Sequence, residues 1–384
     1  MKLRSLMISL VFAATAVACQ KTPAPAEPAP GSATPAAQPA AAGEAKPAAG
    51  TPAAPGEAKP ADPAQVAGAE AEKPPEERPP EIAPEAPQDQ TAVAGVPLSE
   101  FPGLEELPDV RLVEEGSGEK KTLRYRYAAG SKHIMQMRMQ MGMAMKVGER
   151  AMPPVELPAM LMRAEIALGQ PDGDLMPYEF SIPTAPEVEP KEGTSEAVMA
   201  GLKTSMAAMT GLKGTASVDA RGATHKGTFG LEGKDNPQLA QLVDSMGQSM
   251  RQMSIPLPEA AVGVGARWQA RQRLQMGGMT LYQVGEYTLE SIDGDTLKLK
   301  VKLSQLGPKQ TMDPPGLPPG MTAELLDMRG SGEGSMEVVL TSLVPRSQVT
   351  VKSDTSMRMV NQGTPQEMTM SMTMGMTIKP GDAE

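Results

Sequence analysis

Methionine is the residue type in this chain whose spacing could support chemistry. Between residues 134 and 147 every second residue is methionine, and the same alternation returns between residues 368 and 376. These two stretches, the methionine ladders, hold eleven of the 31 methionines: Met135, Met137, Met139, Met141, Met143, Met145, Met368, Met370, Met372, Met374 and Met376. A thioether is soft and polarisable, so it packs against apolar surfaces of varied shape and can also bind Cu(I).

Three interpretations of the ladders stay open on sequence grounds. As ordinary core, methionine fills irregular gaps, although a well-specified core uses it sparingly. As a binding surface, a thioether face repacks around a variable apolar ligand such as an acyl chain. As a Cu(I) site, sulfurs two residues apart on one strand stand roughly 6.5–7 Å apart, so a second strand would have to contribute. We predict an apolar ligand at the eleven ladder methionines, and we assign no metal ligand and no cofactor.

The period of two requires that both ladders be strands. Residues two apart share one face of a strand, whereas in a helix they point about 200° apart. The intervening positions are mostly polar or small, for example Gln136, Arg138, Thr369 and Thr373. We therefore expect the two strands to be neighbours in a curled sheet, with their methionine faces continuous on its concave side and the polar faces toward solvent.

Turn and alternation signals extend the strand pattern through residues 96–384. Leu123 to Tyr127 alternates as a first strand, and Asp172-Gly173, Gly277-Gly278 and Asp293-Gly294 are typical hairpin turns. The proline- and glycine-rich stretch 307–322 is expected to be a loop. Later strands are expected near Ala323 to Met328, Ser335 to Leu343 and Ser347 to Val360. About ten strands is more than an open twisted sheet usually carries without curling.

Two helices are expected between the strands. Thr194 or Ser195 can cap the first, which carries an apolar stripe that includes Leu202 and Met206. Asn236 can cap the second, with Pro237 at its first position. The predicted fold class is therefore mainly β (α+β): a large curved antiparallel sheet or incomplete barrel, with two helices packed on one side and a disordered linker before it.

The N-terminal region divides into two segments. Lys2 and Arg4 precede an apolar run from Leu6 to Ala18 that is too short for a comfortable membrane span, so residues 1–18 are predicted to be a signal peptide. In the segment 21–95, proline and alanine fill 41 of 75 positions, a composition that cannot bury a core. We expect a disordered tether over residues 19–95 and one β-rich domain over residues 96–384.

Composition and motifs argue against several classes of function. The net charge is −10 and the pI is near 5.0, which disfavours nucleic acid as a partner and disfavours membrane attachment by charge alone. No nucleophile elbow, Walker A loop, H-E-x-x-H or C-x-x-C motif is present. His133 and His225 stand without a catalytic partner in the sequence. We therefore expect a protein that is not an enzyme.

The segment Ala16-Val17-Ala18-Cys19 resembles the lipobox of bacterial lipoproteins. That resemblance implies lipidation of Cys19 and membrane attachment through the lipid, and Gln20 in the next position favours the outer membrane. The stretch IPLPEAAVGVGARW (255–268), with the YTLESIDGD hairpin (287–295), resembles an uncharacterised bacterial domain family of unknown function. The expected curved sheet with helices is similar to lipid-binding lipoproteins of the Lol type, at the level of fold alone.

These observations lead to one expected function and two alternatives. We expect a non-enzymatic, exported and membrane-anchored cell-envelope lipoprotein whose methionine-lined domain binds an apolar, lipid-like ligand or a partner. The first alternative is a structural or assembly lipoprotein with a closed core and no ligand. The second is a Cu(I)-binding protein that uses methionine side chains.

Overall fold

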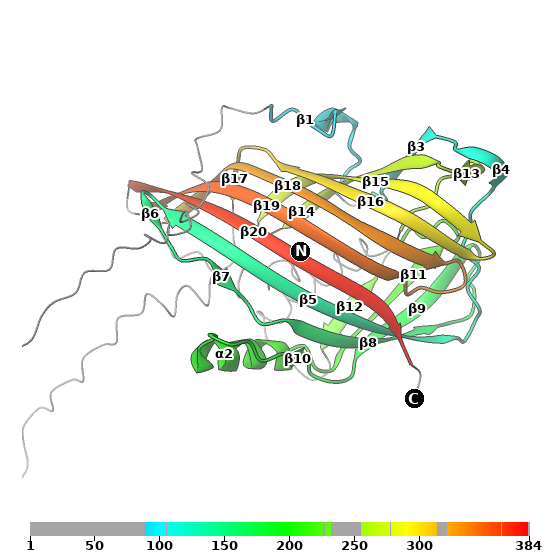
Figure 1. The fold of residues 1–384 in the computed structure, drawn as a ribbon, viewed down its shortest axis with the longest axis horizontal. Helices are drawn as coiled ribbons and strands as arrows, with labels where there is room; N and C mark the ends of the chain where they lie inside the picture. Colours follow the sequence, from blue (N-terminus) through cyan, green and yellow to red (C-terminus); the bar gives the residue numbers. More distant parts are fainter. Residues whose placement is uncertain are drawn as a thin grey trace, which may run out of the picture. The chain divides into compact units, whose positions relative to one another are not determined.

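The computed structural model describes residues 89–104, 106–225, 227–231, 255–276, 278–312, 321–361 and 363–382. Most of these residues belong to one antiparallel sheet of sixteen strands (Figure 1). In sequence order, the strands of this sheet that come before residue 232 are β3 (Asp109–Glu114), β5 (Lys132–Val147), β6 (Arg150–Ala151), β7 (Val155–Glu156), β8 (Met160–Leu168), β9 (Leu175–Ile182), β10 (Glu187–Val188), β11 (Leu212–Asp219) and β12 (Thr228–Leu231). The strands of the same sheet that come after residue 254 are β14 (Arg267–Met276), β15 (Met279–Asp293), β16 (Thr296–Gly307), β17 (Gln310–Met312), β18 (Met321–Val339), β19 (Arg346–Asn361) and β20 (Thr364–Gly381).

Two small sheets and two helical segments complete the described fold. β1 (Ala92–Val93) pairs with β2 (Val96–Pro97), and β4 (Ser117–Lys121) pairs with β13 (Val262–Val264). The helical segments are a 3₁₀ turn, η1 (Leu98–Glu100), and the α-helix α2 (Glu196–Ala207). Ser195 caps α2, because its side-chain oxygen accepts a hydrogen bond from the Val198 N–H at 3.3 Å.

The strand order of the large sheet is β12-β11-β9-β8-β5-β20-β19-β18-β16-β15-β14-β3. The last strand, β20, therefore sits in the middle of the sheet, between β5 and β19, as Figure 1 shows. Within the described part of the chain, β12 and β3 do not pair with each other, so the sheet is open. The long strands β15, β16, β18, β19 and β20 carry most of their hydrophobic residues on the inner face.

The inner face of the sheet holds two main clusters of core residues. The first lies beneath α2 and includes Phe180, Ile182, Leu202 and Leu212, which are at most 4% exposed. The second gathers around Trp268, which is fully buried. Burying a side chain of this size contributes roughly 1.5–3 kcal/mol, so these clusters provide much of the stabilisation of the curved sheet.

A short segment ties the β11 end of the sheet to the β14 end. The Leu257 N–H donates to the Arg221 carbonyl at 2.9 Å, and the Arg221 guanidinium donates back to the Leu257 carbonyl. On the other side the Trp268 indole N–H donates to the Pro256 carbonyl at 2.9 Å. Residues 255–257 thus connect strands that stand nine places apart in the strand order, which holds the sheet in its curved form.

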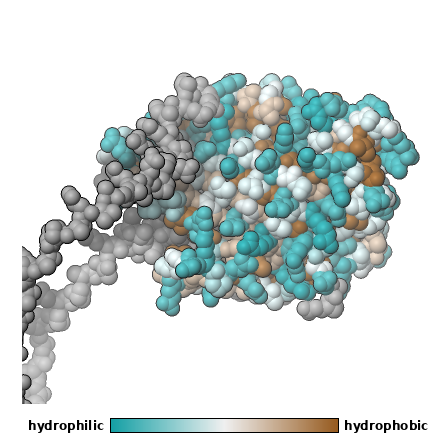
Figure 2. Space-filling model, viewed as in Figure 1, coloured by the Kyte–Doolittle hydropathy of each residue, from teal (hydrophilic) through white to brown (hydrophobic). Residues whose placement is uncertain are grey.

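The outer face of the central strands is polar. Alternate residues of β16 and β20, such as Lys300, Lys302, Thr369 and Thr373, are exposed. Figure 2 shows mainly hydrophilic side chains over this face. The exception lies over β15 and β16, where Val93, Val96 and Phe101 bury Val284 and Leu306 on the outer side. Residues 89–95, which composition assigns to the tether, therefore include a strand and a buried valine.

The structure corrects the fold class predicted from sequence. The described fold is mainly β with one α-helix, so the assignment to α+β with two packed helices is wrong. The first predicted helix is present as α2, and the second, beginning at Pro237, lies outside the described residues. Two strand predictions also fail: Leu123 to Tyr127 is not a strand, and the stretch 329–334, expected to interrupt two strands, is the middle of β18.

Candidate ligand site

The two methionine ladders are adjacent strands in direct antiparallel register. Met370, Met372, Met374 and Met376 of β20 lie opposite Met145, Met143, Met141 and Met139 of β5, respectively. Direct partners on one face of an antiparallel pair have Cβ atoms about 4.5–5.5 Å apart, so the thioethers form one continuous surface. The prediction that the two ladders are neighbours with a common face is confirmed.

The ladder methionines divide between the packed core and a more open surface. Six are at most 9% exposed: Met135, Met137, Met141, Met143, Met368 and Met370. Five are half-buried: Met139, Met145, Met372, Met374 and Met376. Met135 and Met137 belong to the core cluster that contains Leu202 and Met206 of α2. The β5 end of the methionine surface is thus ordinary core beneath the helix.

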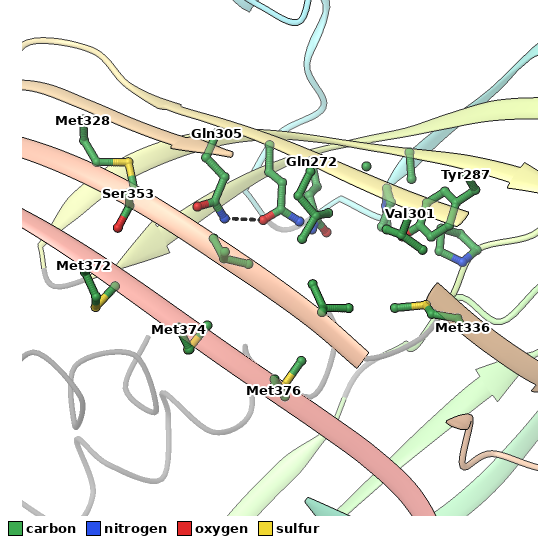
Figure 3. A pocket seen from close by; sticks show the side chains of 18 of the residues that line it. Gln272, Tyr287, Val301, Gln305, Met328, Met336, Ser353, Met372, Met374 and Met376 are labelled. Carbon is green, nitrogen blue, oxygen red and sulfur yellow. Dashed lines mark hydrogen bonds between the residues drawn. The ribbon is translucent and has the colours of Figure 1, made fainter. Parts of the chain in front are cut away.

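The half-buried methionines of β20 line a cavity on the inner face of the sheet, here called the inner cavity (Figure 3). It has a volume of about 220 Å³ and receives residues from β14, β15, β16, β18, β19 and β20. Among the ladder residues its described lining includes only Met370, Met372, Met374 and Met376. Because β14 and β20 are five places apart in the strand order, the sheet must curve around this cavity.

One row of polar side chains crosses the otherwise apolar wall of the inner cavity. Following the register from strand to strand, Gln272 lies opposite Gln283, Gln283 opposite Gln305, Gln305 opposite Gly330, and Gly330 opposite Ser353. The next partner is Met372. We call Gln272, Gln283, Gln305 and Ser353 the polar row. The row beside it consists of Ala270, Gly285, Leu303, Gly332, Val351 and Met374.

Two glutamines of the polar row are nearly inaccessible to solvent. Gln283 and Gln305 are each 8% exposed, and the Gln305 amide N–H donates to the Gln283 side-chain oxygen at 2.5 Å. Figure 3 shows this hydrogen bond and the side chains of Gln272 and Ser353 on the same cavity. Burying an amide costs free energy unless its donors and acceptors are paired. If the glutamine pair served only as core, it would therefore lower the stability of the fold.

Glycines at alternate positions of β18 allow neighbouring residues to approach this strand closely. Gly330, Gly332 and Gly334 lie on the inner face, and atoms of β16 or β19 already occupy the place that a Cβ atom would take at each. A Cβ atom at Gly334 would overlap the Gln348 carbonyl oxygen and lie 2.8 Å from the Val349 Cα atom. This close approach of β18 and β19 requires glycine, and glycine within a strand is typical of a sharp bend in a curved sheet.

The described lining of the inner cavity carries no charged side chain. None of these residues is Asp, Glu, Lys, Arg or His. Its one ionisable group is the Tyr287 phenol, and burial raises the pKa of Tyr287 to about 12, which keeps the phenol neutral at neutral pH. The cavity is therefore suited to an apolar molecule, and its polar contacts come from amides and hydroxyls.

The two histidines have structural surroundings. His225 lies 3.2 Å from the Asp219 carboxylate, which also accepts the backbone N–H groups of Arg221 and Ala223. Burial lowers the pKa of His133, whose ring lies 3.2 Å from the Ser131 hydroxyl. Among the described residues, no three His, Cys, Asp or Glu side chains gather as a metal site, and no helix is long and apolar enough to cross a membrane.

Sequence reasoning found the β20 side of the inner cavity and missed the opposite wall. The glutamines at 272, 283 and 305 stand on three different strands, so no local pattern groups them. For one pair a signal did exist: counting outward from the Gly277-Gly278 turn brings Gln272 opposite Gln283. The pairing of Gln283 with Gln305 does not follow from the Asp293-Gly294 turn, because the register of that hairpin shifts by one residue between Leu289 and Ser291. The lipidation site predicted at Cys19 lies outside the described residues.

Part of the chain matches a known protein family. The sequence profile of a family of unknown function (DUF6263) matches residues 242–342. The match spans strands β13 to β18 and therefore includes the three glutamines and the glycines of β18, while both methionine ladders lie outside it. No curated protein matches this sequence. These comparisons agree with an uncharacterised domain in this part of the chain, and they name no activity.

Proposed function

We propose that this chain is an exported, lipid-anchored binding protein of the bacterial cell envelope whose β-rich domain holds an apolar, lipid-like ligand in the inner cavity. The observation that carries the proposal is the cavity itself, about 220 Å³ in volume and lined largely by methionine, valine and leucine side chains. An engineered apolar cavity of about 150 Å³ is already large enough to bind benzene.

The thioethers supply a second line of support. Met372, Met374 and Met376 are half-buried on the cavity wall, whereas Met135 and Met137 are packed beneath α2. Flexible methionine side chains adapt to ligands of different shape, which suits a carrier of varied acyl chains. The buried ladder residues favour the alternative of a closed structural core for the β5 side, so the binding proposal rests on β20.

The anchor is proposed from the sequence. Cys19, at the end of the apolar run, would carry the lipid, and the proline- and alanine-rich segment would connect the anchor to the domain. Each buried CH₂ of an attached acyl chain contributes about 0.8 kcal/mol, so two or more chains hold a protein on a membrane. The outer membrane is favoured by Gln20. We propose no enzymatic activity.

Native mass spectrometry tests the binding proposal. The full chain carrying Cys19→Ser is exported, purified without detergent and measured before and after extraction with organic solvent. We expect a fraction of the chain to carry an extra mass that the solvent removes, and we expect the stripped chain to bind the neutral fluorophore N-phenyl-1-naphthylamine. A chain that purifies empty and also fails to bind this probe would overturn the proposal.

A further inference from the structure

The buried glutamine pair has hydrogen-bonding capacity that the described residues do not use. A glutamine side chain offers two N–H donors and an oxygen with two acceptor positions. Within the described part of the chain, the bond from Gln305 to Gln283 is the one hydrogen bond that either side chain makes. The Gln283 amide nitrogen and the Gln305 oxygen are thus available to a ligand in the cavity that both residues line.

Gly330 leaves room for the Gln305 side chain within the polar row. Gly330 occupies the register position between Gln305 and Ser353. The Gln305 side-chain oxygen lies 2.7 Å from the place that a Cβ atom at Gly330 would take, so the Gln305 amide extends over this glycine. Neighbouring strands are about 4.8 Å apart, so one ligand group in the cavity that Gln305 and Ser353 both line can reach the two side chains together.

The electrostatics of the site select the kind of polar group that could bind to these side chains. A carboxylate, phosphate or ammonium group taken out of water needs an opposite charge or a dense set of hydrogen bonds. The described lining contains no charged side chain, and Ser353 is only 5% exposed. An amide or hydroxyl group carries no charge and can pair with both the donors and the acceptors of the row, and an ester can pair with its donors.

We infer that the ligand of the inner cavity is a neutral amphipathic molecule, in which an apolar chain contacts the β20 methionines and an uncharged amide, ester or hydroxyl group hydrogen-bonds with Gln283, Gln305 and Ser353. This inference rests on the proposed function and gives it a substrate class: neutral lipids with a hydrogen-bonding group, as opposed to free fatty acids or cationic amphiphiles. The row thus distinguishes ligands that have similar apolar chains.

Displacement of N-phenyl-1-naphthylamine from the stripped Cys19→Ser chain tests the inference. The competitors are octanamide, octanoate and octylammonium, which share the same chain length and differ in charge, at a pH near neutrality. Octanamide is expected to bind at least tenfold more tightly than either ion. The double variant Gln283→Met, Gln305→Met should lose at least tenfold in octanamide affinity while its affinity for the fluorophore changes less than threefold.

The double variant is chosen because it removes both partners of one hydrogen bond, which is far less disruptive than leaving one buried amide unpaired. Thr373→Met on the exposed outer face of β20 is the matched control, since it adds a thioether outside the cavity and should leave the affinities for all three competitors unchanged. Equal affinities for octanamide and octanoate would overturn this inference and leave the proposed function intact. Failure of the fluorophore and of all three competitors to bind would overturn the proposed function as well.

Discussion

Met376 of β20 and Met139 of β5 are direct cross-strand partners on the inner face of the sheet. The row continues on both sides, because Met139 also lies opposite Met160 of β8, and Met376 lies opposite Val349 of β19. Along this line the exposure changes from 3% at Met160 to half-buried at Met376. One methionine surface therefore serves as core at the β8 end and as cavity wall at the β20 end.

This gradient predicts opposite outcomes for the same substitution at two positions. Met135→Gln should destabilise the domain by about 2 kcal/mol or more, because Met135 is 1% exposed and the new amide would be buried without partners. Met374→Gln should change the free energy of unfolding by less than about 0.5 kcal/mol, because water in the cavity can reach the amide. Urea denaturation of both variants measures the difference.

The control for this pair is Gln140→Met, which adds a thioether to the exposed face of β5. It should leave the free energy of unfolding within about 0.5 kcal/mol of the parent chain. Equal destabilisation by Met135→Gln and Met374→Gln would mean that the ladder is uniformly packed and that the cavity wall at β20 is closed.

The glycines of β18 lead to a second prediction. Gly334→Ala should destabilise the domain by about 1–3 kcal/mol, since the added methyl group would overlap the backbone of β19 at Gln348 and Val349. Gly375→Ala is the matched control in β20, where a Cβ atom meets nothing within 4 Å. It should be neutral or stabilising by up to about 1 kcal/mol, because alanine restricts the unfolded chain. Thermal unfolding compares the two, and equal melting temperatures would contradict the close approach of β18 and β19.

The strands β5 and β20 could be predicted from the sequence, whereas the full length of β18 could not. Strict alternation over many residues predicted β5 and β20 as strands and predicted which residues share a face, because the side-chain period of a strand is two. In β18 the same alternation is present in Gly330, Gly332 and Gly334, yet glycine has a low strand propensity, and the stretch was expected to break the strand. There, packing against β16 and β19 overrides local preference.

The long-range relationships were only partly predictable. Two ladders of matching pattern and length suggested neighbouring strands, and the pairing of Met376 with Met139 confirms it. The polar row depends on the register of four strand pairs at once, so the residues next to Gln283 and Gln305 in the sequence do not indicate that these two side chains meet. Leu123 and Tyr125 alternate like residues of a strand, but they do not pair with a neighbouring strand. The Tyr125 N–H instead donates to the Ala220 carbonyl, which lies outside any strand.

Burial of His133 predicts a pH dependence of stability. Burial lowers the pKa of His133 below its ordinary value near 6.5, so the unfolded chain binds a proton more readily than the folded one. The contribution of His133 to the free energy of unfolding therefore falls as the pH drops below 6.5, until the lowered folded pKa is reached, and it is constant above 6.5. His133→Gln should flatten this part of the profile, which urea denaturation at about pH 5, 6 and 8 can measure. An unchanged profile in the variant would show that other groups cause the dependence.

The anchor proposed at Cys19 leads to a prediction in cells. Cys19→Ser should move the protein from the membrane fraction to the soluble fraction, because the lipid and not an apolar span would hold it. Fractionation after a high-salt wash measures this shift, and Gln20→Ser serves as a neighbouring control that keeps the cysteine. A Cys19→Ser protein that still sediments with membranes would contradict lipid anchoring.

Filling the inner cavity tests the binding account most directly. Leu303 lies on the cavity wall, so Leu303→Trp would place an indole ring in the open space of the cavity. Lys302→Trp puts the same ring on the exposed outer face of β16. Titration with N-phenyl-1-naphthylamine should show at least a tenfold loss of affinity for Leu303→Trp, no loss for Lys302→Trp, and similar melting temperatures for both. A folded Leu303→Trp protein that binds the probe as tightly as the parent chain would contradict the assignment of the inner cavity as the ligand site.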